Sequence, residues 1–255
     1  MTMFPVPGRA APARRKGAPG QADEPGGAVA LAAERRRDIL VVVLTLTTGA
    51  LDAVSYLRLG NVFSSVITGN LVLLGVGAGQ QAAALTLNAG LALAGYGAGV
   101  MAGGRLAGTQ QRGQPAWPAR VTVTLGAELV VLAAFSAGWL VTGGHPADGG
   151  RLALLAVAAA AMGMQATAVR RLGQMSTTYL TSTLTALLTA LATWHWPEGW
   201  QRSGGVLIAI VAGATLGAVC AIQFPSWVPA AVLIPLAAVL GARLAVPGDR
   251  PGGSR

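Results

Sequence analysis

A carboxylate lies inside the first long apolar stretch of the chain, at Asp52. A charged side chain at the centre of a bilayer costs roughly 2.5–3.5 kcal/mol on insertion scales. Its helix face is polar, because four residues follow one another at intervals of three, four and three: Thr45, Thr48, Asp52 and Ser55. Such a face should line the interior of a helix bundle. Asp52 is therefore either a carboxylate that couples transport to a proton or cation, or a structural group that caps an interrupted helix or pairs with an arginine.

Two further polar clusters interrupt apolar stretches. Thr68-Gly69-Asn70 lies in the middle of the second stretch, where glycine permits a break in a helix. Thr181-Ser182-Thr183 lies in a segment with eight serine and threonine residues between Ser176 and Thr189. An interrupted helix exposes backbone N–H and C=O groups that can meet a ligand. The alternative is a tightly packed polar kink that binds nothing.

Glu128 lies in the middle third of another apolar stretch, and the amides Asn88 and Gln165 lie at membrane depth. These side chains either contact a transported solute or form hydrogen bonds between helices. We therefore predict a substrate or ion pathway from seven residues: Asp52, Thr68, Gly69, Asn70, Glu128, Gln165 and Thr181.

Glycines recur at intervals of four residues in two other stretches, at Gly95, Gly99 and Gly103 and at Gly213 and Gly217. Small residues at this spacing allow two membrane helices to approach closely. We expect these glycines to pack helices together, within the chain or between copies in a homo-oligomer.

The composition indicates what positions these residues. Of 255 residues, 53% are hydrophobic and 11% charged, against about 25% charged in soluble domains. The net charge of +9 does not indicate nucleic-acid binding, because seven of the 18 basic residues precede residue 38 and most others lie between apolar runs. The sequence has a single cysteine, two isolated histidines and no nucleotide-binding or hydrolase motif. We therefore predict that the protein binds no metal and no cofactor and is not an enzyme. The expected environment is a lipid bilayer.

Eight apolar stretches can be drawn after residue 38: 39–58, 62–79, 82–104, 119–142, 152–170, 174–193, 204–223 and 228–245. If 62–79 and 174–193 enter and leave on one side, 16 basic residues lie on the side of the termini and 2 on the other. If all eight stretches cross, the division is 12 to 6. Basic residues concentrate on the cytoplasmic side. We therefore predict six crossings, two re-entrant or interrupted segments and cytoplasmic termini.

The sequence also contains a weak internal repeat. A shift of 113 residues aligns Ala50–Leu71 with Gly163–Leu184, and places Arg58 on Arg171 and Asp52 on Gln165. With three crossings in each half, the second half is inverted relative to the first.

The predicted fold is an all-α polytopic transmembrane bundle of two inverted repeats. We place a disordered basic tail at 1–37, the transmembrane domain at 38–245 with repeats at about 38–142 and 151–245, and a second disordered tail at 246–255.

Several of these motifs resemble one family. Gly49-Ala50-Leu51-Asp52-Ala53, Gly60-x-Val62-Phe63 and Thr68-Gly69-Asn70-Leu71 are similar to the YoaK-like bacterial multi-pass membrane proteins, a domain of unknown function. The second half adds Gly163-Met164-Gln165-Ala166 and Thr177-Thr178-Tyr179-Leu180-Thr181. The chain departs from the family pattern at Ala166-Thr167 and at Ser182, where a glycine is usual. The resemblance covers residues 38–245 and implies a bacterial inner-membrane protein, without an activity.

Paired interrupted helices in an inverted repeat are typical of secondary transporters. The leading hypothesis is a secondary transporter or permease for an unknown small solute. The alternative is a non-transporting structural or regulatory membrane protein.

Overall fold

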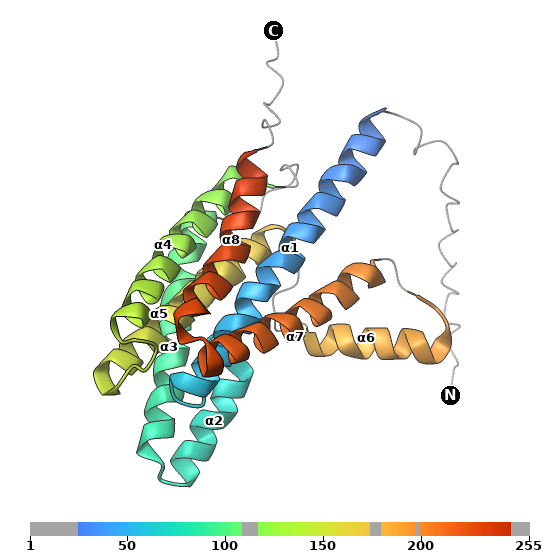
Figure 1. The fold of residues 1–255 in the computed structure, drawn as a ribbon. Coiled ribbons are helices and arrows are strands. Elements are labelled where there is room, and N and C mark those ends of the chain that lie inside the picture. The colour runs from blue at the N-terminus through green and yellow to red at the C-terminus, as the bar shows by residue number, and fades with distance from the viewer. Residues whose placement is uncertain (1–24, 109–116, 174–179, 197–198, 246–255) are drawn as a thin grey trace, which may run out of the picture.

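The computed structural model describes residues 25–108, 117–173, 180–196 and 199–245, and helices are the only regular elements within these ranges. Figure 1 shows their arrangement. The elements are α1 (Pro25–Arg58), α2 (Ile67–Gly79), α3 (Ala83–Ala107), α4 (Ala119–Val141), α5 (Asp148–Arg171), α6 (Leu180–Thr193), α7 (Trp200–Gln223), the 3-10 turn η2 (Pro225–Trp227) and α8 (Val228–Leu244). The all-helical prediction is confirmed for this part of the chain.

Six helices are long and apolar enough to cross a membrane: α1 from Leu31 onward, α3, α4, α5, α7, and α8 together with η2. They coincide with the six predicted crossings. The other two, α2 and α6, have 13 and 14 residues, fewer than the ~20 that a spanning helix needs. They occupy the two stretches for which the sequence predicted re-entrant or interrupted segments.

The first helix begins earlier than the sequence predicted. Residues 1–37 were expected to be disordered, yet α1 starts at Pro25. The physical reason is the run Ala-Val-Ala-Leu-Ala-Ala-Glu-Arg-Arg-Arg at 28–37, which is rich in strong helix formers and contains no proline or glycine. Residues 1–24 and 246–255 lie outside the described residues.

Arginines at helix ends show which ends lie together. Arg36 donates to the carbonyl oxygen of Ala242, so the beginning of α1 meets the end of α8. Figure 1 shows these two helix ends at the same end of the bundle. This arrangement agrees with an even number of crossings.

The close helix pairs join residues far apart in sequence. α1 packs mainly against α7 and also against α8, α3 packs against α5, and α4 packs against α5 and α8. The apolar core between them contains fully buried large side chains: Leu51, Leu125, Phe135, Trp139, Leu155 and Leu236. Of the short helices, α2 packs mainly against α3 and α6 mainly against α7.

Glycines permit the two closest pairs. A Cβ atom at Gly99 of α3 would lie 2.0 Å from the carbonyl oxygen of Ala160 in α5. A Cβ at Gly213 of α7 would lie 2.3 Å from the carbonyl oxygen of Leu46 in α1. Both distances are too short for any side chain. The other three predicted packing glycines, Gly95, Gly103 and Gly217, also abut a neighbouring helix. The structure therefore places all five at contacts within the chain.

Candidate functional site

Asp52 is buried in α1 and is surrounded by hydrogen-bond donors. Its Oδ1 accepts from Ser64 Oγ at 2.8 Å and from the backbone N–H of Ser65 at 2.7 Å. Its Oδ2 accepts from Ser65 Oγ at 2.5 Å. Through these three hydrogen bonds, the carboxylate connects the segment before α2 to α1. Of the two interpretations that the sequence left open, this is the geometry of the structural cap.

Asn70 holds the same segment from the other side. Its Nδ2 donates to the carbonyl oxygen of Phe63 at 2.6 Å, and its Oδ1 accepts from the backbone N–H of Phe63 at 3.0 Å. Asn88 of α3 donates to the carbonyl oxygen of Gly60 at 3.1 Å. Gly60 has a φ of 127°, and a Cβ there would lie 2.2 Å from Asn88 Nδ2, so this position requires glycine. The turn between α1 and α2 is therefore fixed by side chains from three helices.

The helical structure is interrupted earlier in the sequence than predicted. Thr68-Gly69-Asn70 was expected to interrupt a helix, but these residues form the first turn of α2, and the non-helical segment runs from 59 to 66. The positive φ values at Gly60 and Asn61, together with the Asp52 cap, favour the earlier position. Thr68 is exposed, and Gly69 is half-buried.

The second polar cluster is also helical. Thr181, Ser182 and Thr183 belong to α6, and the side chain of Thr181 is exposed. Figure 1 shows α6 beside α7 and away from α4 and α8. α6 packs mainly against α7, and the hydrogen bonds of Asp52 and Asn70 go to Ser64, Ser65 and Phe63, so the described structure shows no hydrogen bond from either residue to Thr181. Residues 174–179, which include part of the hydroxyl-rich segment, lie outside the described residues.

Gln165 of α5 reaches the polar face of α1. Its Nε2 donates to the carbonyl oxygen of Leu44 at 3.0 Å and to Thr48 Oγ1 at 3.2 Å. Thr48 lies one helical turn before Asp52, and Thr45 and Ser55 on the same face are also buried. The predicted polar face of α1 is thus buried in the bundle. Gln165, Thr48 and Asp52 form a polar track along it, which continues through Ser64 and Ser65 into the segment before α2.

Glu128 is fully buried in α4, and neither carboxylate oxygen has a hydrogen-bond partner among the described residues. Four buried atoms of uncharged side chains share this property: Ser55 Oγ, Asn88 Oδ1, Ser136 Oγ and Gln165 Oε1. Buried polar atoms are usually paired. Within the described core, these oxygens are therefore exceptions to that rule.

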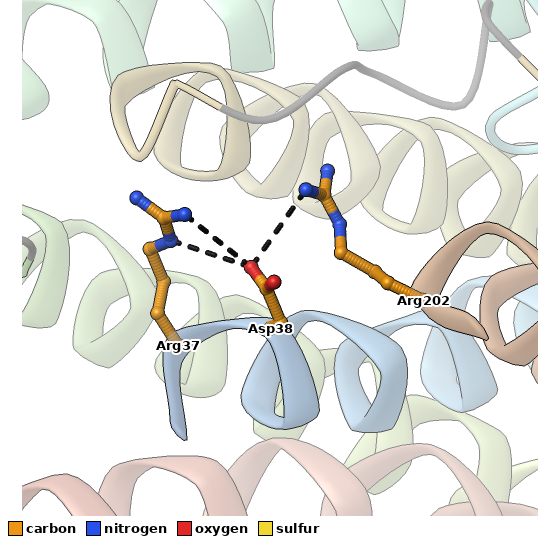
Figure 2. Close-up of polar contacts among 3 residues, drawn as sticks. All are labelled: Arg37, Asp38 and Arg202. Atoms are coloured by element: carbon orange, nitrogen blue, oxygen red, sulfur yellow. Dashed lines mark hydrogen bonds and ion pairs between the residues drawn. The ribbon is translucent and has the colours of Figure 1, made fainter. Parts of the chain in front are cut away.

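An ion pair joins α1 to α7 near the beginning of both helices. Figure 2 shows Asp38 between Arg37 and Arg202. The nitrogen–oxygen distances are 3.4 Å and 3.7 Å, and the three side chains are 21–33% exposed. Such part-exposed pairs stabilise a protein by about 0–1 kcal/mol. They therefore add little to the α1–α7 contact and place no buried charge in the core.

Sequence reasoning did not identify Ser64 and Ser65 as the partners of Asp52. The available signal was a pair of short donor side chains 12 and 13 residues after a carboxylate in an apolar stretch. It also gave no indication that Arg58 and Arg171 would bind the last turns of other helices. Arg58 donates to Ala221 at 3.0 Å and 2.7 Å, and Arg171 donates to Ala107 at 3.1 Å.

Within the ranges that the structure describes, no three histidine, cysteine, aspartate or glutamate side chains come together as a metal site.

A family model described as "protein of unknown function (DUF1275)" matches residues 40–242. The chain is also 34% identical over 154 residues to the UPF0700 transmembrane protein YoaK of Bacillus subtilis (strain 168). That match covers 60% of this chain and 66% of the relative, slightly less than two thirds of its length. No solved structure matches the chain. With a family model over most of its length and six apolar helices long enough to cross a bilayer, this chain is a multi-pass membrane protein of the DUF1275 family.

Proposed function

We propose that this protein is a secondary transporter or permease for a small polar solute, built from two inverted repeats. The proposal rests on one observation: the glycine contacts of the α1–α7 pair recur in the α3–α5 pair at a constant distance along the sequence. A Cβ at Gly49 would meet the carbonyl oxygen of Ile210, and a Cβ at Gly163 would meet that of Tyr96. Gly163 follows Gly49 by 114 residues, and Ile210 follows Tyr96 by the same number.

The offset recurs at other positions. The contact of Gly213 with Leu46 corresponds to that of Gly99 with Ala160, again at 114 residues for both partners. In a third pair of corresponding contacts, that of Gly217 with Ala50 matches that of Gly103 with Met164.

The arginine contacts follow the same relation. Arg58 donates to Ala221 in the last turns of α7, and Arg171 donates to Ala107 at the end of α3. The acceptors differ by 114 residues and the arginines by 113. The two arginines are thus separated by the shift of 113 residues found in the sequence. The residues in the glycine contacts are separated by 114, one residue more. This agreement supports the equivalence of α1 with α5 and of α3 with α7.

Equivalent helices would then run in opposite directions. Each half has three long apolar helices, α1, α3 and α4 in the first and α5, α7 and α8 in the second. An odd number of crossings inverts the second half relative to the first. Inverted repeats with substrate sites at their interface are a recurrent architecture of secondary transporters.

The two short helices are packed differently, which also supports the proposal. The α1–α2 turn is held by Asp52 and Asn70, and Gly77 of α2 lies against Thr86 of α3. In α6 the side chain of Ala190 is buried, while large apolar side chains are exposed in both short helices, such as Leu188 in α6 and Val72 in α2. The helices differ in their packing, because α2 packs extensively against α3 and α6 packs more loosely against α7. Alternating access requires the two repeats to take up different arrangements at any moment. We infer that the tightly packed α2 and the loosely packed α6 represent such a difference between the two repeats.

Water access to the polar track tests the proposal without knowledge of the solute. In a Cys220→Ala background, Thr48→Cys places a thiol beside Gln165, at a position that is 3% exposed. Thr47→Cys is the matched control, because Thr47 is buried on the α8 side of the same helix and donates to Val232. A transporter should allow a membrane-impermeant thiol reagent to label the cysteine at position 48 from at least one side of sealed vesicles, and the one at position 47 from neither. Equal labelling at both positions, or none, would refute the proposed pathway.

The second candidate is a non-transporting structural or regulatory membrane protein. It is favoured by one observation, that the Asp52 oxygens are satisfied by Ser64 and Ser65 and need no ligand. This candidate predicts a dry core, in which neither engineered cysteine reacts.

The proposed location is the bacterial inner membrane with both termini in the cytoplasm. Single cysteines at Ala119 and Ala147 test the orientation, since both residues are exposed and lie at opposite ends of α4. In intact cells, the impermeant reagent should label the cysteine at 147 and not the one at 119. The reverse pattern would contradict this orientation.

A further inference from the structure

Glu128 is a carboxyl group in the middle of a membrane-spanning helix with no local partner. It is the tenth of the 23 residues of α4, and its side chain is 0% exposed. Both carboxyl oxygens lack a hydrogen bond in the described structure. Thr124, one turn earlier, donates its hydroxyl to the carbonyl oxygen of Arg120. Leaving a buried polar group without partners is destabilising, and a charged one more so, so this position calls for an explanation.

The helices packed against α4 supply no charge at this depth. These helices are α3, α5 and α8. Their charged residues all lie within the first or last four residues of the helix: Arg105 in α3, Asp148, Arg151, Arg170 and Arg171 in α5, and Arg243 in α8. The described part of the chain shows no ion pair to Glu128. A bare carboxylate would therefore remain uncompensated in the core.

Asp52 shows the opposite arrangement, which makes it an internal comparison. Its oxygens accept two hydroxyl protons and one backbone N–H. Three donors and no acceptor are the environment of an ionised carboxylate. An environment with neither donors nor cations favours a carboxylic acid, because moving an uncompensated ion out of water costs several kcal/mol. The environments of the two acidic side chains of the core thus differ in how well they stabilise a negative charge.

We propose that Glu128 is a proton-binding site of the transmembrane domain and that its proton is the coupling ion of the transporter proposed above. The carboxyl group holds one proton on one of its oxygens while the core is closed. When the core opens to water, the proton leaves as hydronium and the carboxylate is hydrated. The second part of this proposal rests on the proposed function; the binding of a proton does not.

An apolar carbodiimide tests proton binding directly. Dicyclohexylcarbodiimide enters bilayers and reacts with carboxylic acids: the acid proton moves to a carbodiimide nitrogen, the carboxyl oxygen bonds to the central carbon, and an acyl shift to nitrogen gives a stable N-acylurea. The full-length protein in lipid vesicles should acquire this adduct at Glu128, detected by mass spectrometry of its peptides. Labelling should fall as the pH is raised. Asp52 should remain unlabelled.

Two variants sharpen the test. Glu128→Gln should lose the adduct completely, and Asp52→Asn should retain it at Glu128. Because a proton site has to open to water and reagent during its cycle, no adduct at Glu128 from acidic to alkaline pH would overturn the proposal. An adduct at Asp52 equal to that at Glu128 would overturn it as well. Labelling of Glu128 together with an inaccessible thiol at position 48 would support the proton site and reject the transporter, so the two failures can be distinguished.

Discussion

Replacing Gly99 by alanine should weaken the α3–α5 pair far more than the same change at Gly97. The added Cβ at position 99 would lie 2.0 Å from the carbonyl oxygen of Ala160 and 2.8 Å from its Cα. Both neighbours are backbone atoms, so no side chain can rotate out of the way. To reach an ordinary contact distance of 3.4 Å, one helix has to move by about 1.4 Å, and close-packed helices lose many contacts over such a shift.

The cost can be estimated from the known penalties. Overpacking costs about 1–3 kcal/mol, and a backbone clash of this size belongs at the upper end. For a chain of 150–250 residues, about 1 kcal/mol corresponds to about 2–4 °C in Tm. Gly99→Ala should therefore lower Tm by about 6–12 °C. A Cβ at Gly97 meets nothing within 4 Å, and the better helix propensity of alanine should leave Tm unchanged or raised by about 2–4 °C.

The assay is thermal unfolding of the purified protein in detergent, followed by tryptophan fluorescence and by size-exclusion chromatography after heating. Gly213→Ala tests the same reasoning at the α1–α7 contact, because its Cβ would lie 2.3 Å from the carbonyl oxygen of Leu46. Its Tm should fall by an amount similar to that of Gly99→Ala. If Gly99→Ala and Gly97→Ala unfold at the same temperature, the reasoning from close backbone contact is wrong.

Three further substitutions have definite outcomes. Asn70→Leu removes both bonds to the Phe63 backbone and should cost about 2–4 kcal/mol, measured as a lower Tm; an unchanged Tm would mean that these bonds do not hold the turn. Thr47→Val keeps the shape of the side chain but removes the bond to Val232, so a loss of about 0.5–1.5 kcal/mol is expected in the same assay, and a gain would contradict it. Asp52→Asn retains an oxygen for its donors and should fold, whereas Asp52→Leu leaves those donors unpaired and should yield little monodisperse protein; equal yields of the two would argue against the cap.

The number and type of the helices could be read from the sequence because hydrophobic length and charge placement are local properties. The positive-inside count selected six crossings, and the short helices α2 and α6 lie where that count required them. The burial of Asp52 followed from its spacing with Thr45, Thr48 and Ser55. Each of these inferences depends on residues within a few helical turns of one another.

The partners of the polar residues could not be read in the same way. The position of the break before α2 depends on the positive φ of Gly60 and on Asn88, which lies 28 residues later. Gln165 finds its acceptor at Leu44, 121 residues away. A single sequence does not show which residues so far apart along the chain come into contact. The expectation that Thr181 would join the site failed for the same reason, since a repeat in sequence does not require the two repeats to have the same packing.

The pairing of α1 with α7 affects how the protein can be made. Gly49 enters the membrane with the first helix, but its contact, Ile210, is translated 161 residues later. At about 5–20 residues per second, the delay is roughly 8–30 s. During this time the first half lacks α7 and α5, which are the main packing partners of α1 and α3. Neither half should accumulate alone, and two fragments divided between α4 and α5 should be degraded separately but recovered together when co-expressed.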